Sequence, residues 1–210
     1  MIFLIFSMNM KKDYENIERL IKMAPEVGGV FSLPELSSLF DESSYQALRM
    51  TIKKFQSASL LQPYCRGVYT SKDFSPLILS AKVRSESYVS LGSALAFHRM
   101  IGTESPYLVS SITTGCAASF SGKVNLEYST ITNKLFFGFV PNGDGVKIAT
   151  PEKAVLDTLY FYQHGKTYHF NIFQDIDYSQ VSKKIFEEFL SKYQNPKFVE
   201  FAKDTVYGRI

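Results

Sequence analysis

Three segments with the hydrophobic spacing of helices follow one another in the first third of the chain, and this pattern restricts the fold more than any other feature. Over residues 11–24 the apolar side chains recur at i, i+3, i+4 and i+7, and Pro25 ends the pattern. Residues 32–35 then combine a capping Ser, an early Pro and a Glu three positions on, which is typical of a helix start. A third helix is expected from a cap near residue 44 to about residue 57.

The expected third helix separates an apolar face from a polar, basic one. The apolar face contains Leu48, Ile52 and Phe55, and the polar stripe contains Gln46, Arg49 and Lys53. Two short β-type runs follow at residues 60–64 and 68–70, about a small turn. Helix, helix, turn, helix and two-stranded hairpin is the order of a winged helix-turn-helix domain, which we predict for residues 11–73.

Charge is distributed unevenly along the chain. The 210 residues carry 23 Lys+Arg and 20 Asp+Glu, a formal charge of only +3. Residues 43–84, however, hold seven bases and one acid, a net charge of +6, so the other residues sum to −3. With 45% hydrophobic and 15% aromatic residues the chain can bury a core, which excludes a mostly disordered or collagen-like protein.

A basic helix inside a helix-turn-helix pattern predicts DNA binding. Gln and Arg present donors that match base edges in the major groove, whereas Lys and Arg on the flanks neutralise phosphates. We therefore expect base reading by Gln46, Arg49 and Tyr45, and positioning on the backbone by Lys53, Lys54 and Arg66. The full set of predicted DNA-binding residues is Ser44, Tyr45, Gln46, Arg49, Lys53, Lys54 and Arg66. The alternative for the stripe taken alone is an ordinary solvated surface.

The remaining residues predict a second domain over 77–210, after a hinge at 72–76. A helix is expected over 90–101, followed by strand-like runs at 107–113, 124–128, 135–139 and 146–149, which predict a small, mostly antiparallel sheet. Thr150 and Pro151 open a further helix, and helical spacing returns over 179–193, before a short segment that follows Asn195 and Pro196. The predicted fold class of the whole chain is therefore α+β.

The chain resembles the AbiEi-type antitoxins, the transcriptional repressors of type IV toxin–antitoxin (abortive infection) systems. The resemblance covers nearly the whole chain and is carried by short strings in a fixed order. They are Gly67-Val68-Tyr69, residues 88–98 (YVSLGSALAFH) with Ile101, residues 111–114 and 135–138, and above all residues 148–157 (IATPEKAVLD). The last string is the most specific of them.

The resemblance implies a winged helix that binds inverted repeats in the protein's own promoter, double-stranded DNA being the direct partner. It also implies a C-terminal domain needed to neutralise a nucleotidyltransferase-like toxin encoded next door, without a stable complex between the two proteins. The matched C-terminal strings contain capping and packing residues, so they assign no residue a neutralising role. The alternatives are a winged-helix adaptor that binds protein, or a transcription factor without a toxin.

The sequence contains no convincing catalytic or metal site, and we expect neither enzymatic activity nor a cofactor. Gly92-Ser93 resembles a nucleotidyltransferase signature, but no Asp-x-Asp pair follows it. Asp175 and Asp177 are expected to cap a helix start. The three histidines, His98, His164 and His169, lack the spacing of a helical metal site, and His98 is expected to pack or to contact helix-terminal carbonyls. A small hydrolase or nuclease is the remaining enzymatic alternative.

Cysteine usage and hydropathy indicate a cytoplasmic protein with no membrane partner. Cys65 and Cys116 are far apart and have no neighbours at metal-ligand spacing, which fits a reducing compartment. The apolar run at residues 1–6 is too short for a signal-peptide core and far short of the ~20 residues of a membrane span. We expect a frayed or packed tail there, and an upstream misassigned start codon would explain residues 1–7 equally well.

Overall fold

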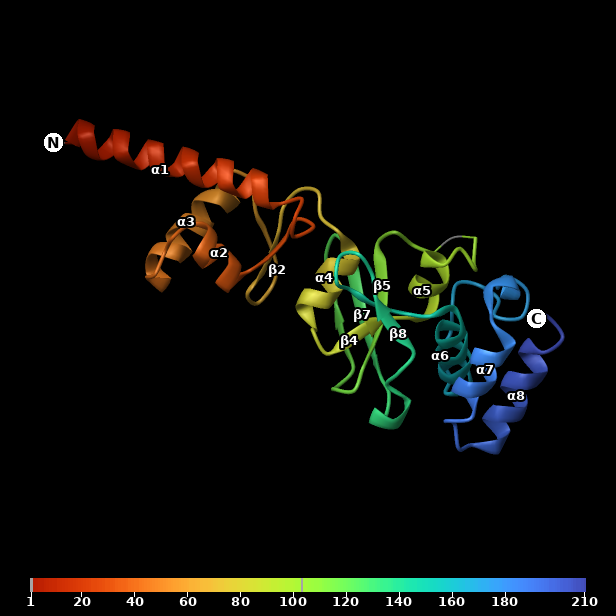
Figure 1. The fold of residues 1–210 in the computed structure, drawn as a ribbon. Coiled ribbons are helices and arrows are strands. Elements are labelled where there is room, and N and C mark those ends of the chain that lie inside the picture. The colour runs from red at the N-terminus through yellow and green to blue at the C-terminus, as the bar shows by residue number, and fades with distance from the viewer. Residues whose placement is uncertain (1, 103) are drawn as a thin grey trace. The chain divides into compact units, whose positions relative to one another are not determined.

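The computed structural model describes residues 2–102 and 104–210, with residues 2–10 described by their backbone alone. The chain divides into two compact units, the first ending at Val83 and the second beginning at Arg84 (Figure 1). The described residues form eight α-helices, one small antiparallel sheet and one larger mixed sheet. The predicted α+β class is therefore confirmed.

The first unit combines four helices with a three-stranded sheet. In this sheet β3 is central and pairs antiparallel with both β1 and β2. The elements are α1 (Ile2–Met23), β1 (Val30–Ser32), α2 (Leu33–Leu39), α3 (Tyr45–Ser57), β2 (Gln62–Cys65), β3 (Val68–Thr70) and α4 (Pro76–Val83).

One apolar core joins α1, β1, α2 and α3. The rings of Phe40 and Phe55 meet in it at a centroid distance of 4.8 Å. Its buried members are Leu20, Phe31, Leu36, Phe40, Leu48, Ile52, Phe55 and Leu61. The apolar face that the sequence predicts for the third helix is thus the face that α3 buries, and this packing fixes which side chains of α3 point outward.

The capping motif at residues 32–35 forms as predicted. The Glu35 backbone N–H donates to the Ser32 hydroxyl at 3.4 Å, and the Ser32 N–H donates to the Glu35 carboxylate at 2.7 Å. Two of the N–H groups that would otherwise lack partners at a helix start are satisfied in this way. The short helix α2 consequently begins at a defined residue and leads into the turn before α3.

β1 is not evident from the sequence, and α1 begins earlier than residue 11. The sequence favours a short connection over residues 28–31, because a strand of three residues carries no alternation pattern of its own. Its partners are the residues of β3, with Val30 opposite Thr70. Gly28 and Gly29 lead into β1 with φ of +58° and +67°, and their carbonyls accept the N–H groups of Ser75 and Ser71. A tail is expected over residues 1–7, but the backbone of residues 2–7 belongs to α1, and residue 1 lies outside the described residues.

The division between the units lies later in the chain than the sequence analysis placed it. Residues 77–83 were assigned to the second domain, but they belong to α4, which lies in the first unit. The Lys82 ammonium anchors α4 there, because it donates to the Val30 carbonyl at 2.7 Å and to the Glu35 carboxylate at 2.6 Å. This contact spans about fifty positions, which local sequence patterns do not reveal.

The second unit is built on a six-stranded sheet of order β6-β7-β5-β4-β9-β8. The strands are β4 (Ser87–Val89), β5 (Leu108–Thr113), β6 (Ala118–Phe120), β7 (Asn125–Thr130), β8 (Phe139–Pro141) and β9 (Lys147–Ala149). The helices are α5 (Leu91–Phe97), α6 (Pro151–Gln163), α7 (Lys183–Leu190) and α8 (Pro196–Val206), with 3₁₀ turns at Asn133–Leu135 and Tyr178–Gln180.

The sheet is mixed: three of its five strand pairs are antiparallel, as expected, but the two parallel pairs were not expected. β5 pairs parallel with β7 along six residues, and β4 pairs parallel with β9. Turn signals show which strands follow one another in the sequence, whereas parallel neighbours are joined by crossovers that leave no local signal. The strand expected over 135–139 is also wrong for most of its length, since Gly138 has a φ of +73° and β8 begins at Phe139.

The helix α6 is buried over its first two turns. Thr150 caps it by accepting the Lys153 N–H, and Pro151 occupies its first turn, as predicted. Residues 152–159 are all buried, because α6 contacts α5, α7, α8 and β9 (Figure 1). A helix enclosed on every side must also bury its polar residues. The helix predicted over 179–193 is shorter than expected and begins only at Lys183.

Candidate nucleic-acid interface

The outward face of α3 consists of two rows of side chains. Residues four apart lie one above the other on a helix. One row contains Tyr45, Arg49 and Lys53, and the neighbouring row contains Gln46, Met50 and Lys54; all six are exposed. The helix has no acidic residue. Five of the six are among the DNA-binding residues predicted from the sequence; Met50 is not, because it has neither a charge nor a hydrogen-bonding group to suggest contact with DNA.

Tyr45 and Arg49 are in contact within their row. The Arg49 guanidinium lies over the Tyr45 ring, 5.8 Å from its centroid. Tyr45 is 63% exposed and therefore leaves the arginine accessible. A cation resting on an aromatic ring loses less side-chain freedom when it binds a ligand. The pair thus presents a partly ordered guanidinium on the first half of α3.

Ser44 stands immediately before α3 but does not cap it through its side chain. Its backbone is extended, with φ −88° and ψ 126°, and its hydroxyl makes no capping hydrogen bond. Its carbonyl accepts the N–H of Leu48 at 2.9 Å, which is the first i to i+4 hydrogen bond of the helix. Ser44 is thus an exposed residue at the positive end of the helix dipole.

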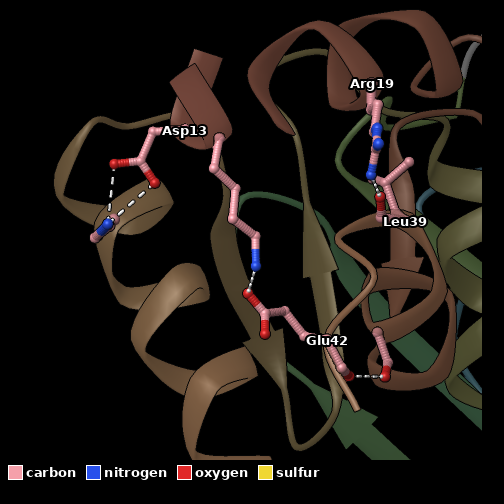
Figure 2. Close-up of polar contacts among 7 residues, drawn as sticks. Asp13, Arg19, Leu39 and Glu42 are labelled. Carbon is pink, nitrogen blue, oxygen red and sulfur yellow. Dashed lines mark hydrogen bonds and ion pairs between the residues drawn. The ribbon is translucent and has the colours of Figure 1, made fainter. Parts of the chain in front are cut away.

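Lys54 differs from Lys53, although the two are neighbours in the sequence. The Lys54 ammonium forms an ion pair with Asp13 of α1, at 2.9 and 3.0 Å from the two carboxylate oxygens (Figure 2). Lys53 takes part in none of the ion pairs found among the described residues. The structure thus gives Lys54 a second task, holding α1 against α3, and neutralises part of its charge.

Further polar contacts hold α1 against α2 and the turn that follows it. Lys12 forms an ion pair with Glu42 at 2.7 Å, and the Arg19 guanidinium donates to the Leu39 carbonyl at 3.3 Å (Figure 2). The Ser37 hydroxyl donates to the backbone carbonyl of Glu42 at 2.7 Å. Each exposed pair contributes only about 0–1 kcal/mol, so the apolar core sets the position of α3 and these contacts refine it.

Two of the other bases counted in the basic segment are also engaged. Lys82 is bound to Glu35, as described above; burial by itself would raise the pKa of that carboxyl, but the hydrogen bonds from Lys82 and Ser32 outweigh it and hold the pKa below its ordinary value. Arg84 belongs to the second unit, where its guanidinium lies over the Tyr128 ring at 5.4 Å. Neither residue adds its charge to the α3 face.

Arg66 lies at the turn between β2 and β3 and is exposed. Gly67 follows it with a φ of +82°, a conformation that favours glycine in a tight turn. Among the described residues, no ion pair includes Arg49, Lys53 or Arg66. These three cations of α3 and the hairpin therefore have no acidic partner among the residues that the structure describes.

In the second unit, a buried lysine and a buried aspartate are paired with each other and with hydroxyl groups of the same unit. The Lys153 ammonium forms an ion pair with Asp157 at 2.6 Å, and both side chains are 0% exposed. Asp157 also accepts the hydroxyls of Tyr88 at 2.9 Å and Ser90 at 2.8 Å, while Lys153 donates to the Tyr193 hydroxyl at 3.1 Å. Burial raises the pKa of the Asp157 carboxyl and that of the Tyr88 phenol. This cluster has structural partners for every charge.

The residues considered for catalysis have structural contacts. The Ser93 hydroxyl accepts the Ser110 N–H at 2.9 Å, Asp177 caps a 3₁₀ turn through the Ser179 N–H, and Asp175 accepts the Asn171 N–H. His98 Nε2 lies 2.7 Å from the Ala149 carbonyl. The part of the chain that the structure describes contains no group of three or more His, Cys, Asp or Glu placed to hold a metal ion.

None of the described helices combines the length and the apolar character needed to cross a bilayer.

Comparisons with known proteins give a likeness in fold alone. The chain matches no protein-family model, and no curated protein sequence is similar to it. Its structure is similar to the crystal structure of the RV2827C protein from Mycobacterium tuberculosis, with a TM-score of 0.60 and 11% sequence identity. The match covers 89% of this chain and 75% of that chain. The two proteins therefore have similar folds over most of their length, with very different sequences.

Proposed function

We propose that residues 11–73 form a winged helix-turn-helix domain that binds double-stranded DNA. The order helix, strand, helix, helix, strand, strand supports this proposal, as does the placement of β1 beside the β2–β3 hairpin in one antiparallel sheet. In such a domain the third helix enters the major groove and the hairpin forms the wing. The turn at Arg66 and Gly67 is then the tip of the wing.

The observation that carries the proposal is the uncompensated charge on α3 and the hairpin. Lys12, Lys54 and Lys82 are paired with acids of the same unit, whereas Arg49, Lys53 and Arg66 lack such a partner among the described residues. These three cations all lie on the elements that a winged helix presents to DNA. Double-stranded DNA is a polyanion with a major groove wide enough for a helix, so it can neutralise all three cations at once.

Each side chain of the interface receives a role from its chemistry. Arg49 donates to guanine O6 and N7, and Gln46 pairs with adenine N6 and N7, from the first half of α3. Tyr45 supports Arg49 and lies at the groove wall. Lys53, Arg66 and Ser44 contact phosphates, with Lys54 contributing through its remaining charge.

We further propose that this protein is a cytoplasmic autorepressor and the antitoxin of a type IV toxin–antitoxin system. This part of the proposal rests on the resemblance to AbiEi-type antitoxins. Most of the residues that carry it lie in the second unit, and the most specific string, residues 148–157, includes both members of the buried Lys153–Asp157 pair. The operator is then a pair of inverted repeats in the protein's own promoter, and the toxin is a nucleotidyltransferase-like protein neutralised without a stable complex.

The DNA-binding proposal is tested by titrating the full chain against a duplex from the region upstream of its own coding sequence. A shuffled duplex of the same composition serves as the reference. We expect tighter binding to the upstream duplex, with an affinity that falls steeply as salt rises. Arg49→Ala should weaken binding to the upstream duplex by about ten-fold or more, and binding to the shuffled duplex much less.

Lys53→Ala and Lys54→Ala form a matched pair in the same titration. Both remove one lysine from the same turn of α3, but only Lys54 is bound to an acid of the chain. Lys53→Ala should therefore cause the larger loss of affinity and lower the slope of the salt dependence by about one unit. Equal, weak and salt-insensitive binding of both duplexes by the wild type would refute DNA binding, and a stable protein partner in its place would favour the adaptor.

The antitoxin proposal is tested separately in cells. The reading frame next to the gene should encode a nucleotidyltransferase-like protein whose expression alone arrests growth. Co-expression of the present chain should restore growth, and the two proteins should not co-purify. An adjacent frame of another kind, with DNA binding intact, would leave a transcription factor without a toxin.

A further inference from the structure

Met50 is a large apolar side chain that is exposed to solvent on the outward face of α3. It is 66% exposed and lies outside the core that α3 forms with α1, β1 and α2. The buried face of the helix is already filled by Leu48, Ile52 and Phe55. Met50 therefore lies outside the apolar core of the described residues, and its exposed side chain is available to a ligand.

The surroundings of Met50 identify the kind of ligand. Its neighbours one turn away are Gln46 and Lys54, and Arg49 and Lys53 flank it in the adjacent row. Met50 is surrounded by polar and cationic side chains, and even with the exposed Tyr45 ring in the adjacent row it does not form the contiguous apolar patch of a protein-docking surface. It does match the DNA major groove, where the 5-methyl group of thymine is the apolar feature among hydrogen-bonding base edges.

Met50 and Gln46 also have the spacing needed to read neighbouring positions of one groove. They are four residues apart and so lie one above the other on the same face, separated by one helical turn of about 5.4 Å. Gln is suited to adenine, and the thymine of an A·T pair carries the methyl group at the opposite side of the same groove. The two side chains together therefore favour A·T pairs.

We propose that Met50 is a specificity-determining residue that contacts the 5-methyl group of thymine in the major groove and, with Gln46, selects A·T pairs in the operator. This inference rests on the proposed DNA binding by α3. Arg49 and Lys53, in the adjacent row, supply guanine and phosphate contacts that do not depend on the methyl group.

The experiment compares two duplexes that differ only in that methyl group. The full chain first selects its preferred sequence from a duplex library with a randomised central segment. The selected duplex is then prepared with deoxythymidine and again with deoxyuridine at every thymidine position. We expect A·T pairs at fixed positions of the selected sequence, and affinity about four-fold lower for each contacted thymine that loses its methyl group.

Variants assign the discrimination to Met50. Met50→Ala should bind the thymidine and uridine duplexes equally, whereas Met50→Leu, which keeps an apolar side chain, should retain the preference for thymidine. Arg49→Ala should bind both duplexes more weakly with an unchanged ratio between them. Since Met50 is exposed, Met50→Ala should unfold at the same temperature as the wild type, which separates this role from a structural one.

The possible outcomes separate this inference from the proposed function. The role of Met50 would be overturned, with DNA binding intact, if a selected duplex bound tightly but with equal affinity in its thymidine and uridine forms. A selected sequence without fixed A·T pairs would have the same consequence. A thymidine preference that persists in Met50→Ala would overturn it too. The absence of any selected sequence, with equally weak binding of all duplexes, would instead refute the proposed function.

Discussion

The first unit keeps its ion pairs at or near the surface, whereas the second encloses Lys153 and Asp157 with no exposed side-chain surface. Surface pairs such as Lys12–Glu42 contribute little to stability and can be broken without leaving a charge in the core. The buried pair connects β4, α6 and the segment containing Tyr193 through hydroxyl groups. Arg49, Lys53 and Arg66 of the first unit, which join no ion pair among the described residues, are thus available for a partner, while the buried pair of the second unit fixes how its own elements meet.

Disrupting the buried Lys153–Asp157 pair should give the largest effect among the tests of this contrast between the units. Asp157→Ala leaves the Lys153 ammonium enclosed without a carboxylate, so the free energy of unfolding of the second unit should fall by about 3–5 kcal/mol. Replacing both residues together, as Lys153→Met with Asp157→Leu, should cost less because no buried charge remains. Urea unfolding followed by far-ultraviolet circular dichroism measures both effects.

Asp204→Ala is the control, since Asp204 is an exposed carboxylate on α8 of the same unit. It should change stability by less than about 0.5 kcal/mol. If Asp157→Ala were as mild as this control, the buried pair would not hold the second unit together and the contrast between the units would fail.

A smaller effect, in the first unit, depends on pH. The pKa of Glu35 lies below its ordinary value of 4.5, so the carboxylate adds stability that is fully present above about pH 4.5 and is lost as the pH falls through the folded-state value. Glu35→Gln should therefore lower the free energy of unfolding by about 1 kcal/mol at pH 7, and this difference from wild type should shrink toward pH 3.

Glu26→Gln is the matched control, because Glu26 is exposed in the turn before β1. Thermal unfolding of the three proteins at several pH values provides the measurement. If Glu35→Gln destabilised the protein equally at pH 7 and pH 3, neither the ion pair with Lys82 nor the helix cap would make a pH-dependent contribution to the free energy of unfolding.

Features encoded within one turn of chain could be predicted from the sequence. The cap of α2 at Ser32, the cap of α6 at Thr150 and the two faces of α3 all depend on residues three or four positions apart. At this spacing the chain's own geometry brings the partners together, whatever the rest of the fold does. The candidate interface on α3 was consequently found from the sequence with only Met50 missing.

Features that depend on distant partners could not be predicted. β1 needs β3, forty residues later, and Lys54 is paired with Asp13, forty-one residues earlier. Lys153 and Asp157 have the i, i+4 spacing of an ordinary surface ion pair. The pair is buried because residues distant in the sequence, such as Tyr193 and Phe137, pack around it. Burial is a property of the assembled unit, so a local pattern does not reveal it.

Amide hydrogen exchange of the full chain, with and without the duplex from its own upstream region, tests most directly the claim that the first unit binds DNA. The account predicts that bound DNA slows exchange in residues 44–54 and in the hairpin at 62–70, and leaves residues 84–210 unchanged. Protection confined to residues 84–210, or no protection under conditions where the duplex is bound, would contradict it.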